Sequence, residues 1–124
     1  MNAGINKNKR KRSHIWGIFA EYFCAGYLML KGYSILKMRY RNHGGEIDIV
    51  ARSGRMVIFI EVKARGEKDA ALYSVTPAKQ RVLARAAEGF IATHAKYSHH
   101  DLRFDVMVVT SRVKIHHIKD AWRL

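Results

Sequence analysis

The sequence is short of proline, cysteine and acidic residues, and each shortage excludes a class of protein. A single proline, Pro77, in a chain that is 48% hydrophobic argues against disorder for most of the length. The lone cysteine, Cys24, cannot form an internal disulfide, which suits a reducing cytosol. Because its neighbours in the sequence are apolar, we expect a packed rather than a reactive thiol.

Long hydrophobic runs are also missing. The most apolar stretch, 15–30, is too short to cross a bilayer and contains Glu21. A secretory signal is disfavoured there as well, because the glutamate and several aromatic residues interrupt the apolar segment. We therefore expect a cytoplasmic protein that has no membrane partner.

Positive charge is the strongest global signal. The 124 residues include 23 Lys and Arg but only 10 Asp and Glu, which gives a formal net charge of +13. Residues 7–12 carry five of these charges, so the rest of the chain still carries +8. Such an excess suits a polyanion such as DNA or RNA. A solvated basic surface, or a ribosome-associated protein without chemistry, explains the same charge, and composition alone does not separate these interpretations.

The length of the chain fits one domain. Residues 1–12 are basic and lack periodicity, so we expect a flexible basic arm there and a single α/β domain over 13–124. Ser13 is a suitable cap for a helix that runs to about Leu30 and ends at Gly32. The elements predicted after this helix are a strand over 33–41, a hairpin of strands over 46–51 and 56–62, a helix that starts at Pro77 with Thr76 as its cap, and strands over 104–109 and 113–118. This order, αβββαββ, is typical of an α/β sandwich around a mixed sheet.

The hairpin is the most secure local prediction, since residues 52–55 form a turn signature between two strand-like segments. If Ser53 and Gly54 are the two central turn residues, Asp48 faces Phe59 across the strands. Facing residues share a side of a sheet, so one side carries polar residues and the other side carries the core. The polar side holds Glu46, Asp48, Glu61 and Lys63, and the core side holds Ile47, Ile49, Ile58, Ile60 and Val62.

Acidic side chains placed this close repel one another unless they bind a cation or take up protons. In the expected register Asp48 and Glu61 are diagonal neighbours, near enough to share one ion. Their hard oxygen ligands favour Mg²⁺ or Mn²⁺ over zinc. Lys63 follows on the same side, where a lysine can orient an attacking water or stabilise charge in a transition state. The alternative is an exposed sheet face on which Lys63 simply neutralises Glu61.

Glu21 is a further candidate ligand. It is the only acidic residue between Met1 and Arg41, and its neighbours one helical turn away are Gly17 and Ala25. A carboxylate on a stripe of small residues can lie close to a neighbouring sheet and reach the same ion. A solvated acid on the helix surface is the alternative, and spacing alone favours that alternative.

Two short motifs, Gly-Glu-Ile-Asp at 45–48 and Glu-Val-Lys at 61–63, occur together with Glu21 upstream and Arg-Phe-Asp at 103–105 downstream. Each motif alone is weak, but the combination is quite specific. From Trp16 to Val109 the sequence resembles a bacterial family of small, predicted endonuclease-like proteins, the YraN-like uncharacterised protein family. That family is similar to archaeal Holliday-junction resolvases and to the wider PD-(D/E)XK superfamily. The resemblance implies a restriction-endonuclease-like three-layer sandwich, with a mixed central sheet flanked by helices.

The resemblance also implies roles for individual residues. Asp48 matches the central metal-binding aspartate, and Glu61 matches the second ligand, with the backbone carbonyl of Val62 as a third. Lys63 matches the catalytic lysine. Glu21 matches the helix-borne glutamate that completes such sites in the resolvase branch.

Four residues are implied in binding nucleic acid. Lys79 or Gln80, at the start of the second helix, would touch the phosphate backbone, and Arg41 and Arg65 match basic positions of the family. One departure concerns Arg39, which stands where the family often has asparagine; another is Ala20, which replaces a usual glycine.

Together these inferences predict a metal-dependent, endonuclease-type phosphodiesterase that acts on DNA, with branched or otherwise structured DNA as one candidate substrate. Mg²⁺ or Mn²⁺ is the expected cofactor. A branched substrate favours a homodimer, because two strands must be cut symmetrically. The alternative is a non-catalytic nucleic-acid-binding protein that retains the nuclease fold.

Other patterns carry less information. The histidine pairs at 99–100 and 116–117 have no zinc-site spacing, and we interpret them as solvated residues of loops or strands. The glycines at 44–45 are not a phosphate-binding loop, since no helix start with Lys and Ser follows. They predict a bend or a close approach of the backbone. Three tyrosines are candidates for stacking on bases, although ordinary packing is commoner: Tyr40, Tyr73 and Tyr97.

Overall fold

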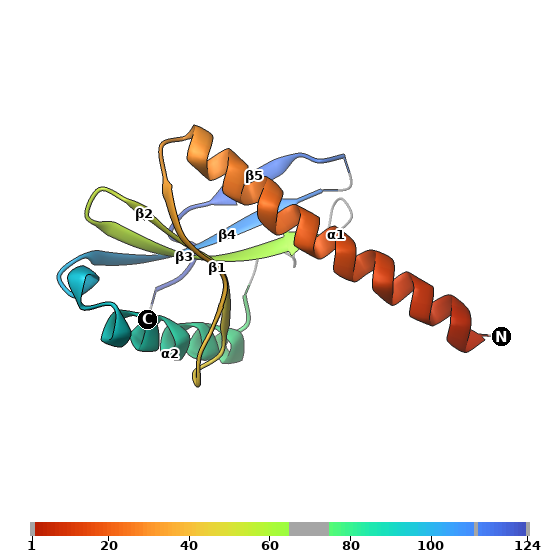
Figure 1. The fold of residues 1–124 in the computed structure, drawn as a ribbon, viewed down its shortest axis with the longest axis horizontal. Coiled ribbons are helices and arrows are strands. Elements are labelled where there is room, and N and C mark those ends of the chain that lie inside the picture. The colour runs from red at the N-terminus through yellow and green to blue at the C-terminus, as the bar shows by residue number, and fades with distance from the viewer. Residues whose placement is uncertain (1, 65–74, 111, 124) are drawn as a thin grey trace.

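A five-stranded sheet lies between two helices in the computed structural model of this protein (Figure 1). The structure describes residues 2–64, 75–110 and 112–123, without the side chains of 2–10 and 13. In chain order the elements are α1 (Asn2–Leu30), β1 (Ser34–Arg41), β2 (Glu46–Ser53), β3 (Met56–Ala64), α2 (Pro77–Thr93), the 3₁₀ turn η2 (Ala95–Tyr97), β4 (Asp101–Val109) and β5 (Ile115–Ile118). Apart from η2, this is the order expected from the sequence.

The strands follow their chain order across the sheet, β1-β2-β3-β4-β5. The β3–β4 pair is parallel and the other three pairs are antiparallel, so the sheet is mixed. Parallel neighbours need a crossover connection, and α2 lies within the connection from β3 to β4. The α/β class and the mixed sheet are confirmed.

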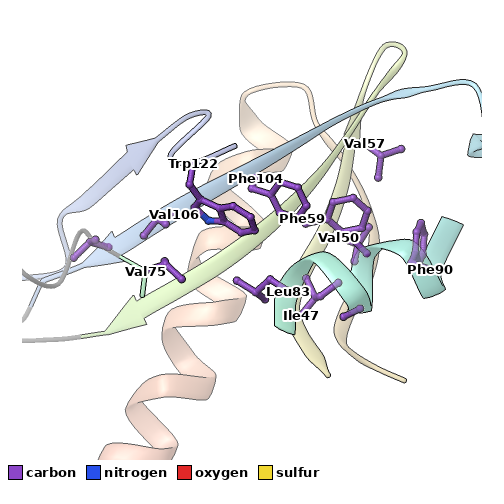
Figure 2. Packing of buried hydrophobic residues seen from close by; sticks show 13 residues of the cluster. Ile47, Val50, Val57, Phe59, Val75, Leu83, Phe90, Phe104, Val106 and Trp122 are labelled. Carbon is purple, nitrogen blue, oxygen red and sulfur yellow. The ribbon is translucent and has the colours of Figure 1, made fainter. Parts of the chain in front are cut away.

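Each face of the sheet is covered by one helix, which gives three layers (Figure 1). Figure 2 shows the cluster between α2 and the sheet, where aromatic rings of the strands meet the helix. The second cluster packs α1 on the opposite face and includes Cys24, whose thiol is buried as expected. The α2 cluster includes Ile47, Val50, Phe59, Leu83, Phe90, Phe104 and Trp122, and the α1 cluster includes Ala20, Leu28, Ile49, Ile58, Ile60 and Met107.

The two helices confirm one predicted start and correct the other. Thr76 caps α2 by accepting a hydrogen bond from the Lys79 N–H at 3.2 Å, and Pro77 is its first residue. By contrast, α1 begins at Asn2 and not at Ser13, so the basic segment continues the helix. Lysine and arginine have high helix propensity, and a sequence without an apolar stripe hides such an extension. Within the described residues, no helix is long and apolar enough to cross a membrane.

The hairpin forms in a register that differs from the expected one. Ser53 pairs with Met56, so Gly54 and Arg55 are the central turn residues. Gly54 has a φ of +58°, a conformation that glycine adopts at little cost and that tight hairpin turns require. The change moves the pairing by two residues. Because side chains alternate with a period of two, Asp48 and Glu61 still share a side.

The predicted core face of the hairpin is partly wrong. Ile49, Ile58 and Ile60 pack beneath α1, whereas Ile47 packs in the α2 cluster. The alternation of β2 is therefore interrupted at Asp48, between the two isoleucines. The alternation of the sequence predicted that only one face of the hairpin is buried, but helices cover both faces of this sheet.

The turn at 42–45 confirms the expected close approach of a glycine backbone. A Cβ added to Gly44 would lie 2.7 Å from the backbone nitrogen of Ala86 in α2. Asn42 fixes the turn: its side-chain oxygen accepts from the Gly44 N–H at 2.8 Å, and its amide donates to the Ala86 carbonyl at 2.9 Å. The turn thus anchors the β1–β2 ends against α2.

Candidate active site

A fork between β2 and β3 creates the candidate site. The β2–β3 pairing runs only as far as Ile49 opposite Ile60, whereas β3 stays paired with β4 to its last residue. Beyond this point the N–H of Val62 has no β2 carbonyl, and an unpaired backbone donor is costly. Asp48 Oδ2 accepts this hydrogen bond at 2.8 Å. The carboxylate is thereby held where the two strands diverge.

Glu61 lies next to Asp48 in the fork, since continuing the observed register by one residue places the two opposite each other. Burial raises the pKa of Asp48 to about 7, with the charge of Glu61 adding to the effect. The hydrogen bond from Val62 opposes this rise because it stabilises the charged form. Lys63 Nζ lies 3.4 Å from Glu61 Oε1. Asp48, Glu61 and Lys63 are therefore brought together.

Glu21 reaches the same place from α1. Its residue is only 8% exposed, and burial raises the pKa of its carboxyl group. The charges of Glu46 and Glu61 raise this pKa further, which places all three acids within electrostatic reach of one another. Of the two alternatives open from the sequence, the buried acid beneath a stripe of small residues is correct, and the solvated acid is wrong.

Two carboxylate oxygens in the site lack a hydrogen bond. Glu21 Oε1 and Glu61 Oε2 are fully buried and have no donor among the described residues. The Arg39 guanidinium lies 3.3 Å from Glu21 Oε1, as an ion pair without hydrogen-bond geometry. Buried acceptors without partners cost free energy, and they are common where a ligand completes the site.

These oxygens suit a hard divalent cation. Among the described residues, no group of three or more His, Cys, Asp or Glu side chains is placed to hold a metal ion. Mg²⁺, however, usually takes one or two protein carboxylates and completes its octahedron with water and substrate phosphate. The donor set of Asp48 and Glu61, with Glu21 beside them, therefore fits Mg²⁺ or Mn²⁺ and is poor for zinc.

The predicted nucleic-acid contacts are only partly near the fork. The charge of Lys79 lowers the pKa of Asp48, so the Lys79 ammonium group of α2 lies within electrostatic reach of the site. The Gln80 amide donates to the Val75 carbonyl at 2.7 Å and so holds the start of α2. Arg41 pairs with Glu46 at 2.8 Å and is well exposed. Arg65 lies outside the described residues, as does Tyr73.

Arg39 is a site residue that the sequence did not identify as one. It has a φ of +48°, in the left-handed region that asparagine adopts more readily than arginine. Its guanidinium lies 3.3 Å from Glu21 and 3.6 Å from Glu46, so it bridges α1 to the start of β2. The only signal in the sequence was its departure from the asparagine expected by resemblance.

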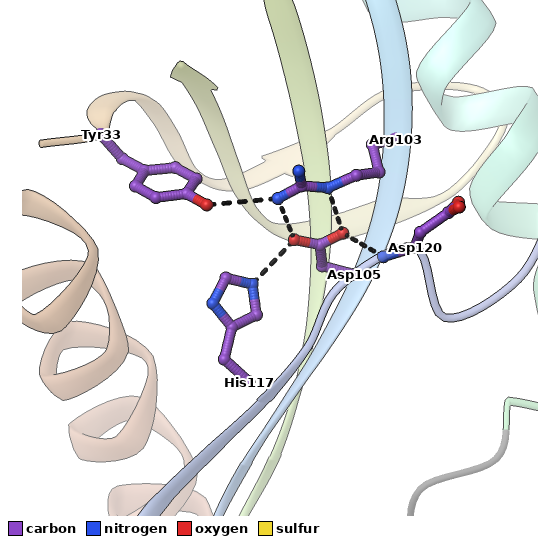
Figure 3. A network of polar contacts seen from close by, with 5 residues as sticks. All are labelled: Tyr33, Arg103, Asp105, His117 and Asp120. Carbon is purple, nitrogen blue, oxygen red and sulfur yellow. Dashed lines mark hydrogen bonds and ion pairs between the residues drawn. The ribbon is translucent and has the colours of Figure 1, made fainter. Parts of the chain in front are cut away.

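A second polar cluster surrounds Asp105 of β4, on the α1 side of the sheet (Figure 3). Its buried carboxylate accepts two hydrogen bonds from Arg103 at 2.8 Å and one from His117 at 2.7 Å, and Arg103 also donates to the Tyr33 hydroxyl at 3.2 Å. These bonds hold the pKa of Asp105 below its ordinary value although burial alone would raise it. The interpretation of His117 as a solvated residue is therefore wrong.

The remaining aromatic candidates pack inside the protein. The Tyr40 ring meets Phe90 edge to face at 5.3 Å, and Tyr97 stacks on the same ring at 6.1 Å. Both tyrosines contribute to the α2 cluster, so the packing alternative holds for them.

Residues 20–109 match the model of the uncharacterised protein family UPF0102. The chain belongs to this family. It is 47% identical to a UPF0102 protein of Bradyrhizobium diazoefficiens over 106 residues, which are 86% of this chain and 80% of that relative. A UPF0102 protein of Parvibaculum lavamentivorans is 43% identical over 107 residues, with the same coverage of both chains.

The segment matched to UPF0102 contains Glu21, Asp48, Glu61 and Lys63. It also contains Arg103 and Asp105 of the second cluster, but not His117. It begins at residue 20, so the first two thirds of α1 lie before it. The resemblance to a predicted endonuclease-like family is thus confirmed as family membership. The family description itself names no activity.

Proposed function

We propose that this UPF0102 protein is a metal-dependent phosphodiesterase of the endonuclease type that acts on DNA. In this proposal its three layers are a restriction-endonuclease-like sandwich of the PD-(D/E)XK superfamily, and the fork between β2 and β3 is its active site. The observation that carries the proposal is the pair of buried oxygens of Glu21 and Glu61, beside Asp48, that accept no hydrogen bond. Burying acceptors whose hydrogen bonds are unmade costs free energy that a ligand would offset.

Each residue of the fork has a role in this proposal. Asp48 and Glu61 would hold Mg²⁺ or Mn²⁺, with Glu21 beside them and the Val62 carbonyl as a further oxygen. The bound ion would polarise a phosphodiester and stabilise the negative charge that develops on it. Lys63, which lies 3.4 Å from Glu61, would orient the attacking water and neutralise charge on the phosphate. The Val62 N–H holds Asp48 in its orientation throughout.

The net charge of +13 supports a polyanionic substrate, because basic side chains outnumber acids by more than two to one. Lys79 would neutralise substrate phosphate near Asp48, since its charge already acts on that carboxyl group. Arg41 and Arg65 would contact the backbone further out. A basic surface around a small acidic site is what a phosphodiesterase needs to bind DNA and still hold a cation.

Cleavage assays on linear, flap and four-way DNA in Mg²⁺ or Mn²⁺ test the proposal. We expect metal-dependent cutting by the unaltered protein and a loss of at least a hundredfold in Asp48→Ala and Lys63→Ala. Lys37→Ala, which removes an exposed lysine of β1, is the matched control and should retain activity. Activity that survives both site substitutions would place the chemistry elsewhere.

The competing function is a DNA-binding protein that has kept the fold without catalysis. Calorimetry with Mg²⁺ separates the two functions. Both the phosphodiesterase and the non-catalytic protein have a basic surface, but only the phosphodiesterase needs a working metal site. Tight DNA binding with no cleavage of any substrate, and no Mg²⁺ binding that Asp48→Ala removes, would favour the competing function.

A further inference from the structure

Helix α1 is apolar on two opposite sides, and its own sheet covers only one of them. Five of the seven large hydrophobic residues that are exposed in the described part of the chain lie on this helix. The first four are spaced by four, three and seven residues, and the fifth follows the third by eight, which places all five on one stripe. This exposed stripe consists of Ile15, Phe19, Tyr22, Met29 and Leu30.

From this stripe we infer that the protein forms a homodimer in which α1 packs antiparallel against α1 of a second copy. A helix that is apolar on both sides is normally buried on both sides. Soluble monomers rarely leave an extended apolar patch in water. The inference goes beyond the proposed activity, because it concerns assembly and needs no nuclease chemistry.

The stripe is complementary to itself when two copies run in opposite directions. Gly26 lies in its middle, and nothing approaches within 4 Å of the position where its Cβ would be. In an antiparallel pair that is symmetric about residues 22 and 23, Phe19 of one copy faces Gly26 of the other. The phenylalanine then fills the space above the glycine of the other copy, and the two-fold axis repeats this contact in the opposite direction. The same register pairs Ile15 with Leu30.

Phe19 of the stripe is held between two neighbouring rings that pack against the α1 cluster. The rings of Trp16 and Phe19 stack at 5.5 Å, and those of Phe19 and Phe23 stack at 5.9 Å. Side chains that hold each other in one rotamer lose little conformational entropy when a partner binds. The ring of Phe19 is thus already ordered for contact with a partner.

Area and charge both fit a second copy. Phe19 is 51% exposed and Leu30 is 89% exposed. With side chains of these sizes, the stripe presents on the order of 600 Å² per copy, so two copies bury about 1,200 Å², the lower bound for specific interfaces. An antiparallel pair also places the two basic segments at 7–12 at opposite ends, whereas a parallel pair would bring them together.

Light scattering coupled to size-exclusion chromatography, over a range of protein concentrations and without DNA, tests the dimer. We expect the unaltered protein to be a dimer and Gly26→Phe to be a monomer, because the new ring occupies the space of Phe19 from the other copy. The Cβ that Gly26→Phe adds has no heavy atom within 4 Å, so the variant should fold, which circular dichroism would verify. The double variant Phe19→Ala with Gly26→Phe exchanges the large and small positions and should restore the dimer.

Leu102→Gln is the matched control, because it removes an exposed apolar side chain of β4 away from the stripe. It should stay dimeric, with a dissociation constant within threefold of the unaltered protein. An unaltered protein that is monomeric at every concentration, or a dimer that Gly26→Phe leaves intact, would overturn the inference. A monomer that instead binds vesicles of anionic lipid through the stripe would also overturn it. Nuclease assays are separate, so either proposal can fail alone.

Discussion

Asp48 illustrates at the scale of one residue how a group of the proposed site opposes stability. Its carboxyl group is held between strands, beside Glu61 and within reach of Glu21, and burial raises its pKa to about 7. At neutral pH part of the population therefore carries a buried charge next to other acids. A fold under no demand for metal or substrate binding would gain free energy by losing this charge.

Asp48→Asn should therefore stabilise the metal-free protein by about 1–2 kcal/mol at pH 8. The amide oxygen still accepts from the Val62 N–H, but the charge is gone. Since the folded pKa of Asp48 lies above its unfolded value, the gain is present above pH 7 and disappears as pH falls below about 4. Urea unfolding at both pH values measures it. Asp101→Asn, an exposed acid, is the control, and a destabilised Asp48→Asn would contradict the prediction.

Asp105 has the opposite balance, because its partners stabilise the charged form. Hydrogen bonds from His117 and Arg103 hold its pKa below the ordinary value despite burial. A lowered pKa means that Asp105 contributes stability above its unfolded pKa, and this contribution is lost as pH falls through the folded pKa.

Asp105→Asn should cost about 3 kcal/mol at pH 7, because it leaves the guanidinium of Arg103 without its buried carboxylate. The cost should shrink at pH 3, below the ordinary aspartate pKa of 3.8, because the unfolded chain then takes up a proton at this position while the folded protein resists it. Thermal or urea unfolding at the two pH values checks this. Asp120→Asn breaks only an exposed ion pair with Arg123, which solvent screens, and should cost far less than Asp105→Asn. An equal loss of unfolding free energy in both variants would contradict the prediction.

Among the elements, the hairpin was predictable because its signals are local. The turn residues and the alternating strands lie within 20 residues, and the two-residue error in register did not separate Asp48 from Glu61, although Ile47 lies on the opposite face from the one predicted. The grouping of Asp48, Glu61 and Lys63 followed from this parity alone. The cap and start of α2 were predictable for the same reason, since Thr76 and Pro77 act on their own helix.

The features that sequence reasoning missed depend on contacts between distant elements. Ile47 packs against α2 and Ile49 against α1, and alternation along one strand does not reveal which helices lie above it. His117 is buried because Asp105, on the neighbouring strand, accepts its hydrogen bond. Arg39 becomes a site residue only because α1 brings Glu21 against β1.

Gly44→Ala should destabilise the protein by about 2 kcal/mol, because its Cβ would meet backbone atoms of α2 that cannot move independently. The nearest of these, Ala86 N and Arg85 C, lie 2.7 Å away. The turn at 42–45 would have to leave α2, which also displaces the start of β2. Chemical denaturation gives the magnitude. Gly17→Ala, where nothing lies within 4 Å, should instead gain up to about 1 kcal/mol from helix propensity. Equal effects at both glycines would be evidence against this packing.

Across the whole molecule, acidic residues gather while basic residues spread. Four of the ten acids lie in or beside the fork, namely Glu21, Glu46, Asp48 and Glu61, in a chain with 23 basic residues. Such a distribution attracts a polyanion over long range and leaves one local site for a cation. Family membership alone gives no reason for this separation, whereas the proposed binding of DNA at a metal site would explain it.

DNA affinity should consequently fall steeply with salt, because each neutralised phosphate releases counterions. With about six phosphate contacts, a rise from roughly 50 to 200 mM salt would weaken binding about a thousandfold. Replacing the five basic residues of 7–12 with glutamine should make the slope of log K against log salt shallower, while Mg²⁺ binding at the fork stays unchanged. Fluorescence anisotropy with labelled duplex DNA gives the slope. If the slope is unchanged, residues 7–12 contact no phosphate, and the +8 on the remainder of the chain must account for binding.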